Sequence, residues 1–138
     1  MAGKKIYCTK INMEELDIFF ASSKEGALRI GISCAKDELT PVQYFRRYFP
    51  KEVLVENKVC NLPLIEAAMS AYKKGSFVKI GFAVRFSLFQ MNVLNAIRKI
   101  KPGTVKTYKQ VAQMINKPKA YRAVGQALRR NPFPLLFP

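Results

Sequence analysis

The chain has 138 residues, of which 49% are hydrophobic, so it can form one compact domain or two small ones and is not expected to be disordered. No apolar run reaches the roughly 18–20 residues that span a bilayer, and no signal segment follows the first residues, which predicts an intracellular protein that is not inserted in a membrane. Three widely spaced cysteines (Cys8, Cys34 and Cys60) and the lack of histidine argue against a metal site, and no cofactor is expected. We expect these cysteines to be buried apolar residues rather than reactive thiols.

The net charge of +15 is distributed unevenly along the chain. Residues 1–66 contain ten Lys or Arg and nine Asp or Glu, whereas residues 67–138 contain fourteen Lys or Arg and no acidic residue. A segment without carboxylates cannot neutralise itself by internal ion pairs, so its natural partner is a polyanion. Nucleic acid is the leading candidate and an anionic membrane surface is the alternative, although no basic amphipathic helix stands apart from the core.

Short apolar runs in the first part of the chain predict a small antiparallel sheet. The runs are Lys5–Cys8, Ile18–Ala21 and Ala27–Ser33, and the last alternates as a half-buried strand does. Residues 22–26 are typical of a hairpin turn between the second and third strands.

Two helices are predicted to follow these strands. Thr40 is placed to cap a helix over 41–48 that starts with proline and ends before Pro50. Asn61 is placed to cap a second helix that runs to about Lys74, with Gly75 as its C-terminal stop.

Residues 76–85 form a short apolar link, after which a new helix is predicted to start at Ser87. Lys101-Pro-Gly103 is expected to end this helix. The apolar residues at helical spacing are interpreted as core residues, namely Phe89, Val93, Ile97 and Ile100. The boundary between two domains is expected within 76–86.

The last part of the chain predicts two short helices joined by a tight turn. Thr107 is placed to cap a helix over 108–115, residues 116–118 form the turn, and a second helix runs over about 119–130. This arrangement is a helix-turn-helix over about 107–130.

The second of these helices has small residues four apart, Ala123 and Ala127, with Gly125 between them. A helix face without bulky side chains allows close approach, and tight packing against another helix is the ordinary reason for it. Several basic residues favour contact with DNA phosphates instead, namely Lys117, Lys119, Arg122, Arg129 and Arg130.

The same segment resembles the O6-alkylguanine-DNA alkyltransferases. The similarity is carried by Val-Lys-Thr-Tyr-Lys-Gln-Val-Ala (105–112), Asn-Lys-Pro-Lys-Ala (116–120) and Arg-Ala-Val-Gly-Gln-Ala-Leu-Arg-Arg-Asn-Pro-Phe-Pro (122–134). It is close over residues 86–138 and only architectural before them. The resemblance implies an α/β fold, with a small N-terminal α/β domain (1–80) that has an antiparallel sheet, then a mostly helical DNA-binding domain (81–138).

The resemblance also implies roles for single residues. Arg122 is similar to the family's arginine finger, which fills the space left by an extruded guanine, and Tyr108 to the tyrosine that presses on the target phosphate. The small residues of the second helix correspond to the face that lies in the minor groove, and Asn131 to the asparagine that ties this helix to the active site. The expected DNA-binding residues are therefore Thr107, Tyr108, Lys117, Lys119, Arg122, Ala123, Gly125, Ala127, Arg129, Arg130 and Asn131. For Arg122 a plain phosphate contact, and for Tyr108 a place in the core, stay open as alternatives.

The match to the family stops at Pro138, before the Pro-Cys-His-Arg motif whose cysteine accepts the alkyl group. We therefore expect no catalytic residue in this chain, and binding of plain or alkylated duplex DNA, with base flipping, without alkyl transfer. Two alternatives stay open: a truncated form of an active alkyltransferase, and a transcriptional or nucleoid helix-turn-helix protein. The apolar C-terminal tail is a further candidate surface for a protein partner.

Overall fold

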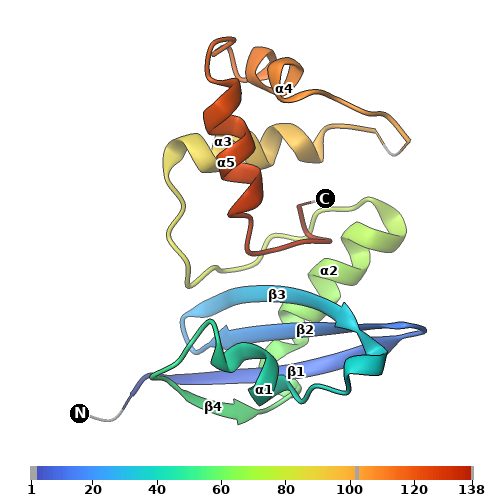
Figure 1. Ribbon diagram of the computed structural model, residues 1–138, viewed down its shortest axis with the longest axis vertical. Coiled ribbons are helices and arrows are strands. Elements are labelled where there is room, and N and C mark those ends of the chain that lie inside the picture. Colours follow the sequence, from blue (N-terminus) through green and yellow to red (C-terminus); the bar gives the residue numbers. More distant parts are fainter. Residues whose placement is uncertain (1–2, 102, 138) are drawn as a thin grey trace. The chain divides into compact units, whose positions relative to one another are not determined.

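The computed structural model describes residues 3–101 and 103–137. The chain divides into two compact units, Met1–Val84 and Arg85–Pro138, which we call unit 1 and unit 2 (Figure 1). Among the described residues no helix has both the length and the apolar character that crossing a membrane requires.

Unit 1 is built on a sheet of four strands in the order β3-β2-β1-β4 (Figure 1). The first three, β1 (Lys5–Met13), β2 (Leu16–Ser23) and β3 (Gly26–Cys34), form two antiparallel hairpins, as the sequence predicts, but each is longer than its apolar run. The fourth, β4 (Val53–Glu56), pairs parallel to β1. The predicted α/β fold with its antiparallel strands is confirmed. The unpredicted fourth strand makes the sheet mixed, because the chain crosses back after β3 to add this strand on the far side of β1.

One face of this sheet packs against α1 (Pro41–Arg46), which ends earlier than expected. The prediction that Thr40 caps this helix is confirmed, because its side chain accepts a hydrogen bond from the Gln43 N–H while the Gln43 side chain accepts from the Thr40 N–H. Tyr44 of α1 stacks on Phe19 with ring centroids 4.2 Å apart, and its ring fills the space that a Cβ of Gly31 would need. The core on this face consists of Ile6, Cys8, Phe19, Ala21, Tyr44 and Phe45.

The helix α2 (Leu62–Lys74) contacts β2 and ends at Gly75, whose φ of +64° confirms the predicted glycine stop. Asn61 does precede this helix, but the expected side-chain cap is absent. Its Nδ2 donates instead to the carbonyls of Tyr7 and Asn57, at 3.1 and 2.9 Å. The side chain thereby joins the start of α2 to β1.

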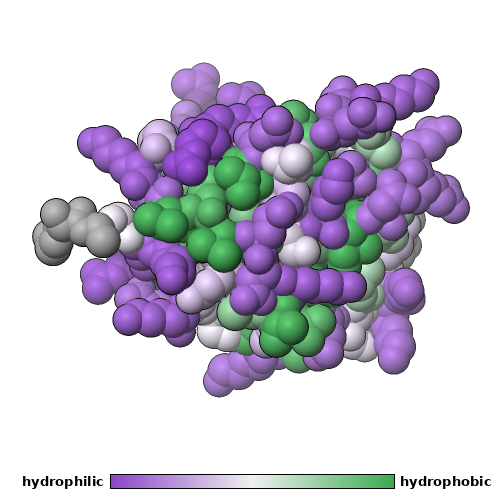
Figure 2. Space-filling model, turned by 90° about the horizontal axis from the view of Figure 1, so that it is seen from below, coloured by the Kyte–Doolittle hydropathy of each residue, from purple (hydrophilic) through white to green (hydrophobic). Residues whose placement is uncertain are grey.

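The link after α2 lies along the sheet edge at β3. The Ala27 N–H donates to the Gly81 carbonyl and the Ala83 N–H donates to the Ala27 carbonyl, at 2.9 and 2.8 Å. Seen from below, the surface is mostly hydrophilic, and apolar side chains occupy small patches within it (Figure 2). Dispersed exposed apolar side chains of this kind are ordinary on protein surfaces.

Unit 2 consists of three helices that contact one another: α3 (Leu88–Arg98), α4 (Tyr108–Met114) and α5 (Tyr121–Arg129). The predicted cap at Thr107 and the predicted helix start at Ser87 are confirmed. Each of these two residues forms a reciprocal pair of hydrogen bonds with the glutamine three residues later. Buried side chains of the three helices form the core, namely Val93, Leu94, Ala96, Ile97, Val111, Ala112, Val124 and Ala127.

The helix α3 departs from its predicted extent and stripe. It ends at Arg98, before Lys101-Pro-Gly103, of which Pro102 lies outside the described residues. Val93 and Ile97 are buried as expected, whereas Phe89 and Ile100 are only half-buried. Leu94 and Ala96 complete the buried face instead.

Candidate nucleic-acid interface

Unit 2 contains no Asp or Glu, so its basic side chains have no carboxylate of their own unit to pair with. Both salt bridges found among the described residues, Lys4–Glu25 and Lys10–Asp17, belong to unit 1. No carboxylate side chain within unit 2 neutralises its net positive charge, which favours an anionic partner.

Helices α4 and α5 are joined by residues 115–120, in which Asn116 adopts a left-handed conformation with φ of +60°. An asparagine tolerates this conformation better than most residues do. The turn exposes Lys117 and Lys119, the two lysines that the sequence singles out. The Lys117 Nζ lies 5.9 Å from the centroid of the Phe89 ring, so its charge stands over the start of α3.

Tyr108 opens α4 with 48% of its surface exposed, so it is not the core residue of the alternative interpretation. Its ring packs on Gly125 of α5: a Cβ built at Gly125 would lie 2.9 Å from Cε2 of Tyr108. The cap residue Thr107 accepts from the Gln110 N–H, and its hydroxyl proton is left to donate elsewhere.

The three small residues of α5 do not form the single bare face that the sequence suggested. Ala123 is exposed, Ala127 is buried, and Gly125 is covered by Tyr108. Residues four apart on a helix share a face, whereas a residue two positions on points about 200° away. Only Ala123 and Ala127 therefore lie together.

Ala123 and Ala127 lie in a surface hollow of about 610 Å³ between the start of α3 and α5. Arg122 and Arg130 also line the hollow, and both side chains are exposed. The remaining lining residues are Ser87, Phe89, Gln90 and Gln126. The structure thus brings together two small residues and two cations on a concave surface, which is a shape that a nucleic-acid backbone can fit.

Arg129 and Asn131 lie outside this hollow. Arg129 is exposed near the end of α5. The half-buried Asn131 holds the following turn: its Nδ2 donates to the Phe137 carbonyl at 2.8 Å, and its Oδ1 accepts from the Phe133 N–H at 2.9 Å. Both functional ends of the Asn131 amide are therefore engaged within the protein.

The sequence predicts no binding role for α3, although Ser87, Phe89 and Gln90 line the hollow. The pair Ser87 and Gln90, spaced as a capping box, places polar groups at the start of this helix and could have indicated them. Lys109 was missed as well. Its Nζ lies 5.3 Å from the centroid of the Tyr121 ring, which joins the first turns of α4 and α5.

The cysteines offer no metal site and differ from one another. No cluster of three or more His, Cys, Asp or Glu suited to a metal occurs in the described part of the chain. Cys8 is buried as expected, and burial, with the nearby charge of Glu56, raises the pKa of its thiol to about 11. The expectation of burial is wrong for Cys34 and Cys60, which are exposed.

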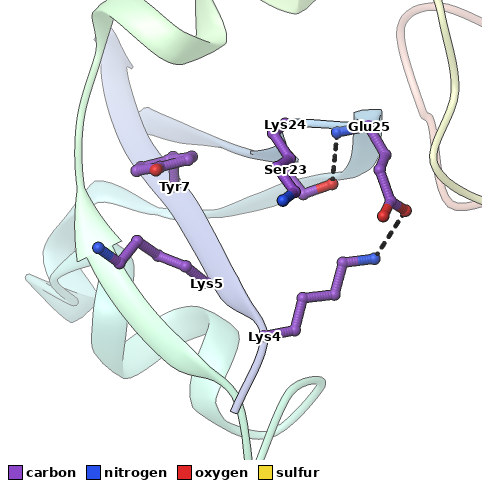
Figure 3. Close-up of a pocket in the computed structure, with 6 residues that line it drawn as sticks. All are labelled: Lys4, Lys5, Tyr7, Ser23, Lys24 and Glu25. Carbon is purple, nitrogen blue, oxygen red and sulfur yellow. Dashed lines mark hydrogen bonds and ion pairs between the residues drawn. The ribbon is translucent and has the colours of Figure 1, made fainter. Parts of the chain in front are cut away.

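Unit 1 has a concave surface of its own, of about 390 Å³, lined by residues of β1 and of the turn between β2 and β3 (Figure 3). Lys4 lines it and pairs with Glu25 at 3.1 Å, and Ser23 accepts a hydrogen bond from the Glu25 N–H. This pocket neutralises part of its own charge, unlike the hollow of unit 2, so it is a weaker candidate for a polyanion.

Known proteins share both the sequence pattern and the fold of this chain. Residues 88–138 match the family described as 6-O-methylguanine DNA methyltransferase, DNA binding domain. The inducible methylated-DNA–protein-cysteine methyltransferase of Bacillus subtilis is 30% identical over 135 residues, which cover 96% of this chain and 74% of that protein. The corresponding enzyme of Methanosarcina barkeri is 48% identical over 50 residues, which cover 36% of this chain and 32% of that protein.

The fold is also found in a solved structure, Mycobacterium tuberculosis OGT in complex with DNA. It aligns with a TM-score of 0.62 at 20% identity and covers 96% of this chain and 75% of that chain. At this identity the likeness establishes a shared fold and no more.

Proposed function

Because the chain belongs to the methylated-DNA–protein-cysteine methyltransferase family, we propose that it binds duplex DNA through unit 2, with α5 in the minor groove. The observation that carries this proposal is the hollow at α5, which Arg122, Ala123 and Arg130 line together on a unit without acidic side chains. Exposed cations bind the phosphates, and the missing bulk at Ala123 lets the helix approach the groove.

The phosphate contacts are assigned to the basic residues around the hollow. Lys117 and Lys119 at the turn, and Arg129 and Arg130 at the end of α5, supply charge without reading sequence. The free hydroxyl proton of Thr107 adds a donor at the start of α4. The family match favours this role over a transcriptional one, which would read base edges in the major groove.

Arg122 and Tyr108 are assigned to base extrusion. Arg122 is exposed beside Ala123, from where it can enter the duplex and replace the stacking of a lost base. Tyr108 has an exposed hydroxyl-bearing ring held on Gly125, a suitable support for pressing on a phosphate. The favoured target is an alkylated guanine, since a weakened base pair costs less to open.

None of the three cysteines is proposed as an alkyl acceptor. All lie in unit 1, Cys8 holds its proton up to a pKa of about 11, and the sequence has no histidine to activate Cys34 or Cys60. Mass spectrometry after incubation with O6-methylguanine duplex is expected to find all three unmodified.

The test compares two exposed arginines of α5. Arg122→Ala is expected to weaken binding to an O6-methylguanine duplex about ten-fold more than binding to plain duplex, because the finger acts only once the stack is open. Arg129→Ala is expected to weaken both equally, as removal of a phosphate-binding side chain does.

Two measurements decide between these outcomes. Fluorescence of 2-aminopurine at the target position is expected to rise on binding of the wild type, and an unchanged signal at saturation would remove the extrusion role of Arg122. The slope of log affinity against log salt is expected to change by about 0.9 for each phosphate that a variant no longer neutralises. A wild-type slope near zero would contradict DNA binding by unit 2 altogether.

A further inference from the structure

Two arginines of unit 1 lie against one tyrosine ring. The guanidinium carbon of Arg29, on β3, is 3.9 Å from the ring centroid of Tyr48, and that of Arg47, at the end of α1, is 5.3 Å from it. Arg47 also lies 4.8 Å from the ring of Tyr44. We call Arg29, Arg47 and Tyr48 the arginine–tyrosine cluster.

The two arginines of the cluster have no anionic partner. Within residues 3–101 and 103–137, no carboxylate lies within 4.0 Å of either guanidinium, and the buried Nε of Arg29 has no hydrogen-bond partner. The adjacent Arg46 is different, because its Nη1 donates to the carbonyls of Phe49, Pro50 and Glu52 at 2.9–3.4 Å. Arg46 thus stabilises the turn after α1, whereas no carboxylate among the described residues forms a salt bridge with Arg29 or Arg47.

Two like charges against one ring repel each other, and an anion near both would offset this repulsion. Attraction of each cation to the ring offsets only part of it. Tyr48 is 37% exposed, so a ligand can reach the cluster from solvent. Burial raises the pKa of Tyr48, but interaction of its hydroxyl with Tyr44, the positive charges of Arg29 and Arg47, and the interaction of the same hydroxyl with the Arg29 side chain outweigh this effect. The pKa of Tyr48 is therefore lowered below its usual value.

We propose that the arginine–tyrosine cluster binds a phosphate group. A contact with the face of a ring uses none of the guanidinium N–H groups as hydrogen-bond donors, and guanidinium N–H groups match phosphate oxygens in pairs. A phosphate has enough oxygens to accept from two guanidiniums and one hydroxyl at once, whereas a carboxylate has only two. The source of the phosphate is either a free anion or the backbone of a nucleic acid, and this site does not depend on the role assigned to unit 2.

The first experiment uses inorganic phosphate as the probe. Side-chain ¹⁵N NMR signals of Arg29 and Arg47 are followed as phosphate replaces chloride at constant ionic strength, and a saturable shift is expected. Arg47→Gln is expected to weaken this binding about ten-fold or more. Lys51→Gln is the matched control, since it removes one charge from an exposed side chain of the same unit and should leave the affinity unchanged.

Further variants separate recognition from folding. Arg47→Lys keeps the charge but loses the planar fork, so binding several-fold weaker than wild type is expected. Tyr48→Phe keeps the ring and loses one donor, which predicts a smaller effect than that of Arg47→Gln. The proposal is overturned if no saturable shift occurs, or if Lys51→Gln weakens binding as much as Arg47→Gln.

The second experiment identifies the source. If the cluster binds a DNA phosphate, Arg47→Gln reduces the salt slope of duplex binding by about 0.9 and Lys51→Gln does not. If the cluster binds a free anion, Arg47→Gln leaves the salt slope of duplex binding unchanged, while the wild-type protein still shows the phosphate-induced NMR shift. Arg122→Ala protein should bind inorganic phosphate as the wild type does, so failure of the DNA-binding proposal would leave this one standing.

Discussion

At Gly125 the missing side chain makes room for a neighbouring aromatic ring. The sequence grouped it with Ala123 and Ala127 on a bare face, because all three are small. The structure instead places it under the ring of Tyr108, which sits where a Cβ would project. Which neighbour covers a glycine is a tertiary fact, and residue size alone does not contain it.

Gly125→Ala should therefore separate stability from function. Alanine is favoured over glycine within a helix by about 0.8–1 kcal/mol, and the half-exposed Tyr108 ring can move aside, so we expect unchanged or slightly raised stability. Displacing that ring should weaken DNA binding several-fold. Thermal unfolding and fluorescence anisotropy with a labelled duplex measure the two effects.

The control for this prediction is the Gly125→Ala substitution in a protein that lacks the Tyr108 ring. In a Tyr108→Ala background, Gly125→Ala should cause no additional decrease in affinity, because the two changes act through one contact. Additive effects would show that Gly125 contacts DNA directly, as the sequence suggested.

The raised pKa of the Cys8 thiol predicts that the free energy of unfolding falls at alkaline pH. Its pKa is about 11 in the folded protein and has an ordinary value of 9.0, so the folded state holds the proton more tightly than the unfolded chain. Stability contributed by this group is present below pH 9 and is lost as the pH rises from 9 to about 11. Urea unfolding should show a steeper decline in this range for the wild type than for Cys8→Ala. Cys34→Ala, which removes an exposed thiol, should follow the wild type; equal slopes in all three proteins would show that Cys8 is not the cause.

Among the secondary-structure elements, those with local signals were predicted well. Thr40 and Thr107 cap their helices as expected, and Ser87, predicted only as a helix start, caps the third; each precedes a glutamine by three residues. The strand β4 was not predicted, because its four residues become a strand only by pairing with β1 some 48 positions earlier, at Lys5 and Val53. A pairing across that distance leaves no periodicity in a short segment.

Asn61 provides a sharper test, since the cap interpretation and the structure disagree about it. Its Nδ2 donates to two carbonyls in a site with no solvent exposure. Asp is as good a helix cap as Asn, but it would turn a carboxylate towards both carbonyls. We expect Asn61→Asp to lower the free energy of unfolding by about 2 kcal/mol or more. A change below about 0.5 kcal/mol in chemical denaturation would favour the cap interpretation.

For the whole molecule, the uneven distribution of charge could be predicted from the sequence, whereas the hollow that gathers basic residues of unit 2 could not. The basic residues of α5 and of the turn were named in advance, but the hollow also requires Ser87, Phe89 and Gln90 from α3. The arginine–tyrosine cluster likewise joins residues of β3 and α1 that no motif links. Spacing along the chain predicts a helix face, and only packing shows which faces meet.

The absence of carboxylates in unit 2 also determines how its surface responds to protons. Unit 2 has no Asp, Glu, His or Cys, the residue types that ordinarily titrate below pH 9. We therefore expect duplex affinity at fixed salt to be the same from about pH 5.5 to 8.5, as anisotropy titrations would show; a fall of more than about three-fold across this range would mean that a titrating group elsewhere takes part. Acidification of the surroundings cannot switch such a surface on or off. What remains to regulate it is the local concentration of small cations, or a covalent modification that removes the charge of a lysine.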